Sequence, residues 1–439
     1  MSTFAVNATH DPALRSWVDT ANLAGAEFPI QNLPFAVFKT DGGQARCGVG
    51  IGDQVLDVAA CASLFGGDAA GSAQACAEPA LNTLMALGPA AAHALRARLS
   101  QLLDAREHEH REATARHLLP IAGVELVLPV RVGGYTDFFA SVHHATNAGW
   151  LFRPDNPLLP NYKYVPIAYN GRANSVRVSG DAVRRPHGQI RPADTAAPSY
   201  EPARRVDHEV ELALYIGRPS QLHRPVRVAD AWDHVFGFSL LNDWSARDIQ
   251  AWEYQPLGPF LAKSFATTVS PWVVTAEALA PFRTAPAPRS EGDPEPLPYL
   301  ADPHDASHGA LHIALTAQLR TAAMAARGIP PLTLSTSNAA SLYWTCAQML
   351  AHHTSNGSAL DTGDLLGSGT ISGASEDALG SLLEITRGGA RPFEIAATGE
   401  TRRFLEDGDE VTLTGRSERA GCVPIGFGAC SATLLPASA

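Results

Sequence analysis

Four acidic residues stand in segments whose local patterns set the direction of each carboxylate. Glu209 and Glu211 alternate with apolar residues, so a strand would place both carboxylates on one face. Asp243 follows the apolar run 235–241, which predicts a buried strand, and stands where the chain turns into a helical segment. A lone Glu-x-Glu in a strand more often belongs to a solvated face. Four carboxylates held together would repel one another unless a cation balanced their charge, so the whole set favours a bound cation.

The fourth acid, Asp137, precedes a pair of histidines. Thr136 has the side chain of a helix N-cap, and Asp137, Ser141 and His144 follow at a spacing of i, i+4 and i+7. We therefore expect one helix to carry them on one face, while one of the two histidines, His143 and His144, lies on the helix surface. Two turns, about 10 Å, would then separate the carboxylate from the imidazole and leave room for a cation, a substrate and a water.

Longer motifs around these residues resemble the fumarylacetoacetate hydrolase family. They are Asp-Phe-Phe-Ala-Ser-Val-His-His-Ala-Thr-Asn (137–147), Asp-His-Glu-Val-Glu (207–211), Asn-Asp-Trp-Ser-Ala-Arg-Asp-Ile-Gln-Ala-Trp-Glu-Tyr (242–254) and Gly-Thr-Ile-Ser-Gly (369–373). The similarity runs in order from about residue 28 to residue 430, which is nearly the whole chain. It implies hydrolysis of the carbon–carbon bond of 4-fumarylacetoacetate to fumarate and acetoacetate, the last step of tyrosine and phenylalanine degradation.

The resemblance also implies a role for each site residue. His144 would be the base that activates water, and Glu384 would orient that histidine and stabilise its charged form. The other expected roles are shared by sets of residues: Asp137, Glu209, Glu211 and Asp243 as ligands of the catalytic cation; Asp243, Lys263 and Thr267 as ligands of a second, structural cation; Arg247, Gln250 and Lys263 as donors to an oxyanion; Phe139, Arg153, Gln250, Tyr254 and Thr370 as substrate-binding groups. Taken singly, Glu384 could be a solvated acid and Arg247 half of a surface ion pair.

Hydrolysis of a β-diketo acid needs a cation because a bare carbanion is a poor leaving group. A divalent cation that chelates the departing acetoacetyl unit would spread its charge as an enolate. Hard oxygen ligands favour Ca²⁺ or Mg²⁺ over zinc. The same site could serve an acylpyruvate hydrolase, a decarboxylase or an isomerase, and a cation-stabilised binding protein without turnover is a third hypothesis.

Two residues depart from the family pattern. Phe139 stands where a tyrosine is usual, and Asn170 stands where a histidine is usual. If the missing hydroxyl normally bonds a buried substrate oxygen, its absence weakens binding by about 1 kcal/mol or alters the acyl group that is accepted. Arg153 could still hold the substrate carboxylate.

The length, composition and hydrophobic pattern of the chain predict the domains, strands and helices that carry these residues. The chain has 439 residues, of which 45% are hydrophobic and 18% charged, so we expect a globular protein with two domains. The pattern predicts short strands within residues 35–58, helices over 80–117, many short strands from 131 onward and one helix near 336–353. Composition alone predicts a β-rich fold with some helix.

The resemblance implies a more specific architecture, mainly β with some α. A small SH3-like barrel with a helical tail would occupy residues 1–129, and a mixed β-sandwich roll of the family type would occupy residues 130–439, in a homodimer. The net charge of −11 argues against nucleic acid or an anionic membrane as partner. No run approaches the about 18 apolar residues of a spanning helix, and the first residues lack a secretion pattern, so the cytoplasm is the expected compartment.

Two further segments are rich in charge or proline, and the first of them is assigned no chemistry. The run 106–112 holds histidines and acids, but alternating charge on a helix is typical of a solvated face. Residues 281–310 predict a proline-rich acidic loop.

Overall fold

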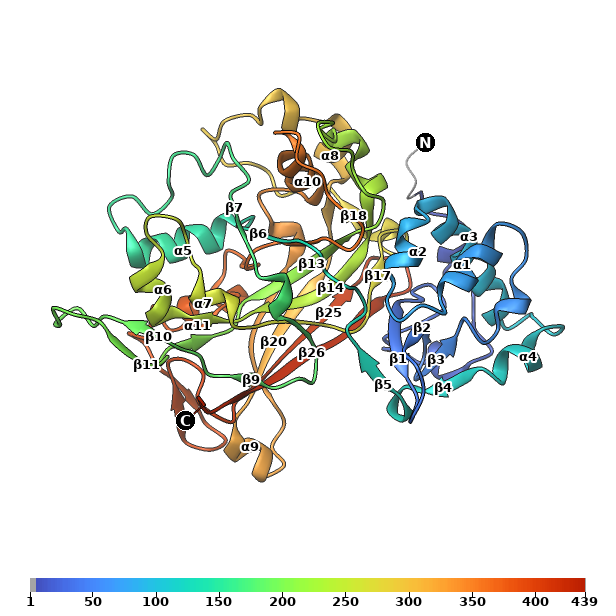
Figure 1. The fold of residues 1–439 in the computed structure, drawn as a ribbon, viewed down its shortest axis with the longest axis horizontal. Coiled ribbons are helices and arrows are strands. Elements are labelled where there is room, and N and C mark those ends of the chain that lie inside the picture. The colour runs from blue at the N-terminus through green and yellow to red at the C-terminus, as the bar shows by residue number, and fades with distance from the viewer. Residues whose placement is uncertain (1–4, 439) are drawn as a thin grey trace.

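The computed structural model describes residues 5–438 of the chain. It is mixed α/β, with about 28% strand and 26% helix, so helices contribute more than the expected mainly β class implies. The N-terminal elements lie together beside a larger C-terminal part that contains most of the sheets (Figure 1). Within the described residues, no helix has the length and apolar character needed to cross a membrane.

The N-terminal part contains an antiparallel sheet in the order β4-β3-β2-β1-β5. Its strands are β1 (Phe35–Lys39), β2 (Arg46–Ile51), β3 (Gln54–Asp57), β4 (Leu118–Pro120) and β5 (Glu125–Val127). Its helices are α1 (Ala70–Ala75), α2 (Asn82–Ala86), α3 (Pro89–Leu103) and α4 (Arg111–Ala115). The strands expected within residues 35–58 are confirmed, whereas closure into an SH3-like barrel stays a prediction.

A larger sheet in the C-terminal part runs in the order β7-β6-β22-β13-β14-β16-β8, with β17 paired to β14. Its strands are β6 (Tyr135–Phe138), β7 (Ala168–Asn170), β8 (Val176–Val178), β13 (Val210–Ile216), β14 (Val235–Asp243), β16 (Thr267–Val269), β17 (Val274–Thr275) and β22 (Leu365–Gly367). Strand β22 pairs parallel with β6 and antiparallel with β13, so segments far apart in the sequence meet at the middle of the sheet.

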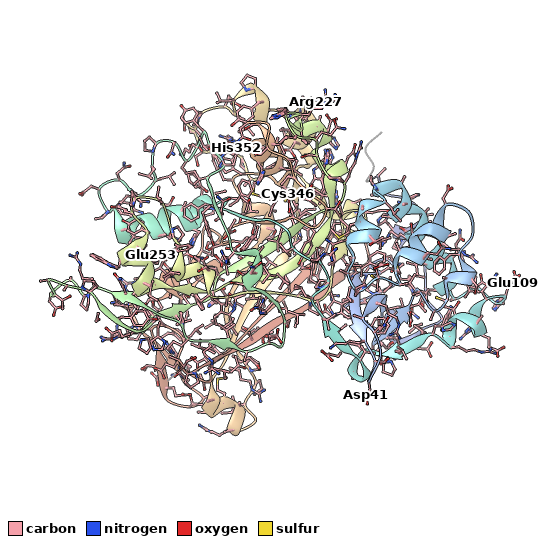
Figure 2. The ribbon with its side chains drawn as sticks, viewed as in Figure 1. Asp41, Glu109, Arg227, Glu253, Cys346 and His352 are labelled. Atoms are coloured by element: carbon pink, nitrogen blue, oxygen red, sulfur yellow. The ribbon has the colours of Figure 1, made fainter. Side chains whose placement is uncertain are left out.

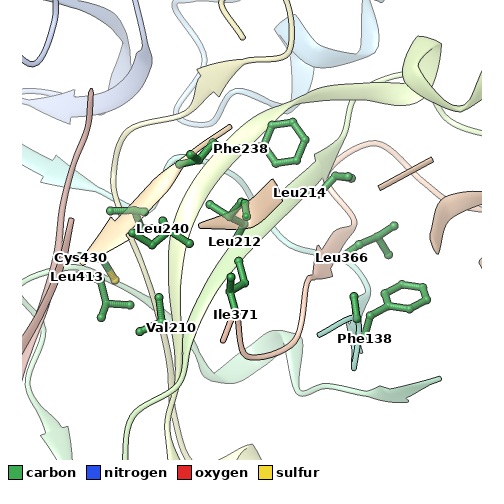
Figure 3. Packing of buried hydrophobic residues seen from close by; sticks show 14 of the residues in the cluster. Phe138, Val210, Leu212, Leu214, Phe238, Leu240, Leu366, Ile371, Leu413 and Cys430 are labelled. Carbon is green, nitrogen blue, oxygen red and sulfur yellow. The ribbon is translucent and has the colours of Figure 1, made fainter. Parts of the chain in front are cut away.

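Strand β13 separates two cores because its side chains alternate between the faces of the sheet. Leu212 and Leu214 belong to the core of the C-terminal part, whereas Ala213 and Tyr215 pack with the N-terminal residues. Figure 3 shows Leu212 in the first of these cores, which also contains Leu413 and Cys430 of the second sheet. The expected alternation along this strand is confirmed.

The second C-terminal sheet runs in the order β21-β20-β25-β26-β9. Its strands are β9 (Val183–Arg184), β20 (Ala314–Arg320), β21 (Leu332–Asn338), β25 (Glu410–Ser417) and β26 (Ile425–Leu435). The short paired strands are β10 (His187–Ile190) with β11 (Ser199–Pro202), β12 (Val206–Asp207) with β15 (Ser245–Ala246), β18 (Arg283–Thr284) with β19 (Ala310–Leu311), and β23 (Phe393–Ile395) with β24 (Glu400–Arg402).

The C-terminal helices are short and lie around these sheets. They are α5 (Val142–Phe152), α6 (Arg247–Glu253), α7 (Leu261–Ser264), α8 (Pro303–His308), α9 (Ala322–Ala326), α10 (Cys346–Thr354) and α11 (Leu382–Ile385). The helix expected near 336–353 is wrong in its first half, where β21 continues to Asn338 and a 3₁₀ turn follows at Ala339–Ser341. It begins only after Thr345, which forms a capping box with Gln348.

The charged run 106–112 lies far from the C-terminal sheets. Glu109 stands at the outer end of the N-terminal part, and Asp41 lies at another of its edges (Figure 2). This position agrees with the assignment of no chemistry to the run.

Candidate active site

Three of the four acids meet at the middle of the large sheet. Asp137 comes from β6, Glu211 from β13 and Asp243 from the end of β14. Each offers a carboxylate oxygen within 4.8 Å of the others, and all three side chains are buried. The sheet therefore brings together acids that are up to 106 residues apart in the sequence.

These three acids fit a hard divalent cation. Asp137 Oδ1, Asp243 Oδ1 and both carboxylate oxygens of Glu211 are buried, and no group among residues 5–438 offers them a hydrogen bond. Burial, followed by the charges of the neighbouring acids, raises the pKa values of Asp137 and Glu211 well above their usual range. Carboxylate oxygen atoms that are crowded, buried and without a protein hydrogen-bond partner match the donor set of Mg²⁺ or Ca²⁺.

A glycine leaves the space that this cluster needs. Gly367 of β22 pairs with Asp137 on one side and with Ala213 on the other. A Cβ atom at Gly367 would clash with Asp137 Oδ1 and lie 3.3 Å from Glu211 Oε2. The absent side chain therefore lets two carboxylates approach each other across the strand between them.

The fourth acid, Glu209, has a different environment. Lys263 Nζ forms an ion pair with Glu209 and lies 2.5 Å from Asp243 Oδ2, and Arg247 Nη2 lies 2.8 Å from Glu209 Oε1. Burial alone would raise the pKa of Glu209, but Lys263 and Arg247 outweigh it and lower that pKa far below its usual range. Glu209 is thus balanced by the protein's own cations, and its role as a fourth ligand stays a prediction.

The expected second cation site involves residues beside Asp243. Thr267 of β16 stands opposite Asp243 in the strand pairing. The Lys263 side chain carries an ammonium group, which has no free electron pair, so only its main-chain carbonyl could ligate a cation. A structural cation held by these residues stays a prediction.

The single helix expected to carry Asp137, Ser141 and His144 is wrong. Asp137 lies on β6, which pairs with β22 on one side and β7 on the other, so its backbone is held extended. Thr136 does not cap a helix, because it lies inside β6, where its hydroxyl is 2.9 Å from His353 Nε2. The helix begins one turn later, where the Ser141 hydroxyl accepts a hydrogen bond from the main-chain nitrogen of His144.

His144 nevertheless reaches the same site and forms a pair with Glu384. His144 Nδ1 lies 2.7 Å from Glu384 Oε2, and both side chains are buried. On the opposite side of the ring, His144 Nε2 is 3.9 Å from Glu209 Oε1. The imidazole thus stands between the carboxylates of Glu384 and Glu209.

Glu384 is held by three further hydrogen bonds that the sequence motifs did not identify. The hydroxyls of Ser372 and Ser381 donate to its Oε2, and the side-chain amide of Asn147 donates to its Oε1. Burial opposes ionisation, but His144 and these donors lower the pKa of Glu384 to about 2. Ser381-Leu-Leu-Glu384 is a capping-box pattern, a local signal that predicts the start of α11.

A cavity of about 380 Å³ joins the acids to the histidine. This volume is in the range of small-molecule sites. The expected site residues that line it are Asp137, Phe139, His144, Arg153, Glu209, Glu211, Arg247, Gln250, Tyr254, Lys263 and Thr370. Asp243, Thr267 and Glu384 do not line the cavity. Asp243 and Glu384 nevertheless contact residues that line it, namely Lys263 and His144.

Two aromatic residues complete the wall of the cavity. The ring of Phe139 meets the ring of His144 edge-on, with centroids 5.4 Å apart. Tyr169, which the sequence interpretation did not select, donates its hydroxyl to Asp243 Oδ2 at 2.8 Å. Asn170, the second departure from the family pattern, follows Tyr169 in β7 and does not line this cavity.

Comparison with known proteins identifies the family. The model described as Fumarylacetoacetase N-terminal matches residues 31–129, and the model described as Fumarylacetoacetate (FAA) hydrolase C-terminal matches residues 134–435. A fumarylacetoacetase of Oryza sativa subsp. japonica is 45% identical over 434 residues, which cover 97% of this chain and 98% of that protein. Fumarylacetoacetases of Bos taurus and Caenorhabditis elegans are 45% and 46% identical, each over 94% of this chain and 97% of the relative. The chain belongs to the fumarylacetoacetate hydrolase family.

Proposed function

We propose that this protein is a hydrolase that cleaves the carbon–carbon bond of 4-fumarylacetoacetate to give fumarate and acetoacetate, the last step of tyrosine and phenylalanine degradation. One observation carries the proposal: His144, which is paired with Glu384, lines the same cavity as Asp137 and Glu211 of the acidic cluster, in a chain about 45% identical over nearly its full length to fumarylacetoacetases. That similarity does not favour the related acylpyruvate hydrolase, decarboxylase or isomerase chemistry.

In this proposal, His144 is the base. Glu384 accepts a hydrogen bond from the N–H group of His144 Nδ1, so Nε2 keeps a free electron pair and can take a proton from the attacking water. The oxygen of that water bonds to the carbonyl carbon next to the fumaryl double bond, and the carbon–carbon bond then breaks. The imidazolium, stabilised by the ionised Glu384, returns the proton to the departing carbon of acetoacetate.

Asp137, Glu211 and Asp243 are the proposed holders of the catalytic cation, with Glu209 as the fourth ligand. When bound, a divalent cation would act as a Lewis acid that spreads the charge of the departing acetoacetyl group. We propose Ca²⁺ or Mg²⁺, because the available donors are carboxylate oxygens. The structural cation expected at Thr267 remains part of this proposal.

Arg247, Gln250 and Lys263 are the proposed donors to the negative oxygen that forms when water attacks. Arg247 Nη1 donates to Gln250 Oε1 at 3.1 Å, which leaves the amide hydrogens of Gln250 free for the cavity. Donors fixed before the reaction need no rearrangement as the charge develops, which is why they stabilise the transition state.

Arg153, Tyr254 and Thr370 are the proposed substrate-binding groups, together with Gln250 and the apolar face of Phe139. All of them line the cavity. The planar guanidinium of Arg153 suits a substrate carboxylate, because it can offer two parallel hydrogen bonds.

We also propose a domain boundary, a homodimer and a cytoplasmic location. We place the boundary between the two domains at residues 129 and 130, close to the gap between the two family-model matches. A homodimer is supported by exposed apolar side chains near the cavity, among them Trp150, Leu257 and Phe260, since such patches often mark protein interfaces. Sedimentation velocity of the purified protein tests the dimer, and cell fractionation tests the proposed cytoplasmic location.

The function is tested by a steady-state assay on 4-fumarylacetoacetate beside other acylpyruvates. Fumarate and acetoacetate in equal amounts are the expected products, with fumarylacetoacetate giving the highest kcat/KM. Release of CO₂, formation of a tautomer, or a clear preference for another acylpyruvate would contradict the proposal.

A further inference from the structure

We propose that Asp207 is a positioning residue of the catalytic centre, which holds Arg247 and the start of helix α11 in one fixed arrangement. This inference rests on the proposed function, in which Arg247 is an oxyanion donor and Glu384 of α11 orients His144. Asp207 lies on β12, is fully buried and does not line the cavity, so it has no contact with the reacting atoms.

The Asp207 carboxylate contacts two other segments of the site and the main chain of its own. Its Oδ2 accepts a hydrogen bond from Arg247 Nε at 2.9 Å, and Arg247 Nη2 lies 2.8 Å from it, although without hydrogen-bond geometry. The main-chain nitrogens of Leu382 and Leu383 donate to Oδ1 and Oδ2 at 2.8 and 2.9 Å. Its Oδ1 also accepts from the main-chain nitrogen of His208 at 2.8 Å.

Each of these segments carries a group of the proposed mechanism. Leu382 and Leu383 open the four-residue helix α11, and Glu384 is the next residue. The chain leads from Asp207 through His208 to Glu209, whose Oε1 lies near Arg247 Nη2. One carboxylate therefore fixes the spacing between the oxyanion donor, the histidine's partner and the fourth acid.

Asp207 also sets the direction of the Arg247 guanidinium. Because Nε is bonded to Asp207, the other two nitrogens point toward Glu209 and Gln250. Without that carboxylate, the arginine would be drawn toward the remaining carboxylate of Glu209 alone. A shift of about 1 Å in a group that stabilises a transition state can lower kcat about 100-fold.

Substitution by asparagine keeps the contacts of Oδ1 and removes those of Oδ2. In Asp207→Asn, the amide oxygen can still accept from the main-chain nitrogens of Leu382 and His208, but the amide nitrogen replaces Oδ2 and repels the N–H groups of Arg247 and Leu383. Asp207→Ala removes all of these contacts. We expect Asp207→Asn to lower kcat about 100-fold with much less change in KM, and Asp207→Ala to lower kcat further.

The coupling to Arg247 is tested in a double-mutant cycle. Arg247→Gln alone should lower kcat about 100- to 1,000-fold, as does loss of an oxyanion donor elsewhere. In that background, adding Asp207→Asn should lower kcat by much less than 100-fold, since the contact with Arg247 is already gone and the contact with Leu383 is the one still lost. A further 100-fold loss in the double variant would overturn the inference.

Asp409→Asn is the matched control. Asp409 is also fully buried, accepts from Arg402 Nε at 2.8 Å and from the main-chain nitrogen of Glu406 at 2.9 Å, and does not line the cavity. The Asp409→Asn variant should have a lower melting temperature, as Asp207→Asn does, but its kcat should stay within about twofold of the wild-type value. Equal losses of kcat in both variants would show that Asp207 has only a structural role.

Two readouts do not depend on turnover, so they decide the inference even if wild-type protein fails to hydrolyse fumarylacetoacetate. Asp207→Asn should raise the melting temperature of Arg247→Gln, because it removes an unpaired buried charge. A crystal structure of Asp207→Asn should show the Arg247 guanidinium displaced from Gln250 while His144 still bonds Glu384. An unmoved guanidinium would refute the positioning role.

Discussion

Replacement of Glu384 by glutamine tests the carboxylate–histidine pair with little change of shape. The side chain is buried and accepts four hydrogen bonds, from His144, Asn147, Ser372 and Ser381, all between 2.7 and 2.9 Å. Glutamine can keep some of these bonds, but it carries no charge and presents an amide nitrogen to one of the donors. The main loss is therefore the negative charge that stabilises the imidazolium.

The lowered pKa of Glu384 sets the size of the expected loss of kcat. These surroundings lower it from 4.5 to about 2, which corresponds to about 3 kcal/mol in favour of the ionised form. This stabilising contribution is complete above pH 4.5 and is lost as the pH falls toward 2. If half or more of it supports the transition state, kcat should fall about 10- to 150-fold at neutral pH.

The assay is steady-state hydrolysis of 4-fumarylacetoacetate by Glu384→Gln, with Glu400→Gln as the control. The pKa of Glu400 is also lowered to about 2, mainly by hydrogen bonds from Thr321 and Thr398, but Glu400 does not line the cavity. We expect the control to keep wild-type kcat. If Glu384→Gln also kept kcat within about threefold, the assignment of His144 and Glu384 as base and partner would be refuted.

Three further substitutions have expected outcomes. Phe139→Tyr restores a hydroxyl beside His144 and should lower KM for fumarylacetoacetate about fivefold; an unchanged KM would show that the hydroxyl meets no substrate oxygen. Gly367→Ala should weaken Mg²⁺ or Ca²⁺ binding at least tenfold in calorimetric titration, because the new Cβ clashes with Asp137; undiminished affinity would place the cation elsewhere. Lys263→Met should lower the free energy of unfolding by about 3–5 kcal/mol in urea without added cation, since Glu209 and Asp243 lose their partner; a loss below 1 kcal/mol would contradict this reasoning.

Local periodicity predicts part of the site well. Alternation predicts that Glu211 shares a face of β13 with Ala213 and Tyr215, and that Glu209, which directly precedes the strand, points the same way. The two cores confirm the division of Ala213 and Tyr215 from Leu212 and Leu214. The apolar run before Asp243 predicts the strand β14, which ends at that residue. These signals are readable because the side chains of a strand alternate whatever its partners are.

Long-range pairing accounts for what local pattern cannot predict. Thr136 and Asp137 have the spacing of a helix start, but pairing with β22, more than 200 residues away, makes them a strand. Lys263 contacts Glu209 across 54 residues, and Asp207 contacts α11 across 175, so neither contact leaves a local signal. The resemblance identified the residue types of the site, whereas the separation of Glu209 from the other acids follows only from the fold.

The most direct test is turnover of 4-fumarylacetoacetate by protein stripped of divalent cations and then titrated with Mg²⁺ or Ca²⁺. The cluster of Asp137, Glu211 and Asp243 predicts that the stripped protein loses its activity and that one of these cations restores it. The stripped protein should remain folded by circular dichroism, so that the loss reports on chemistry. Full activity in excess chelator would contradict a cation-dependent mechanism.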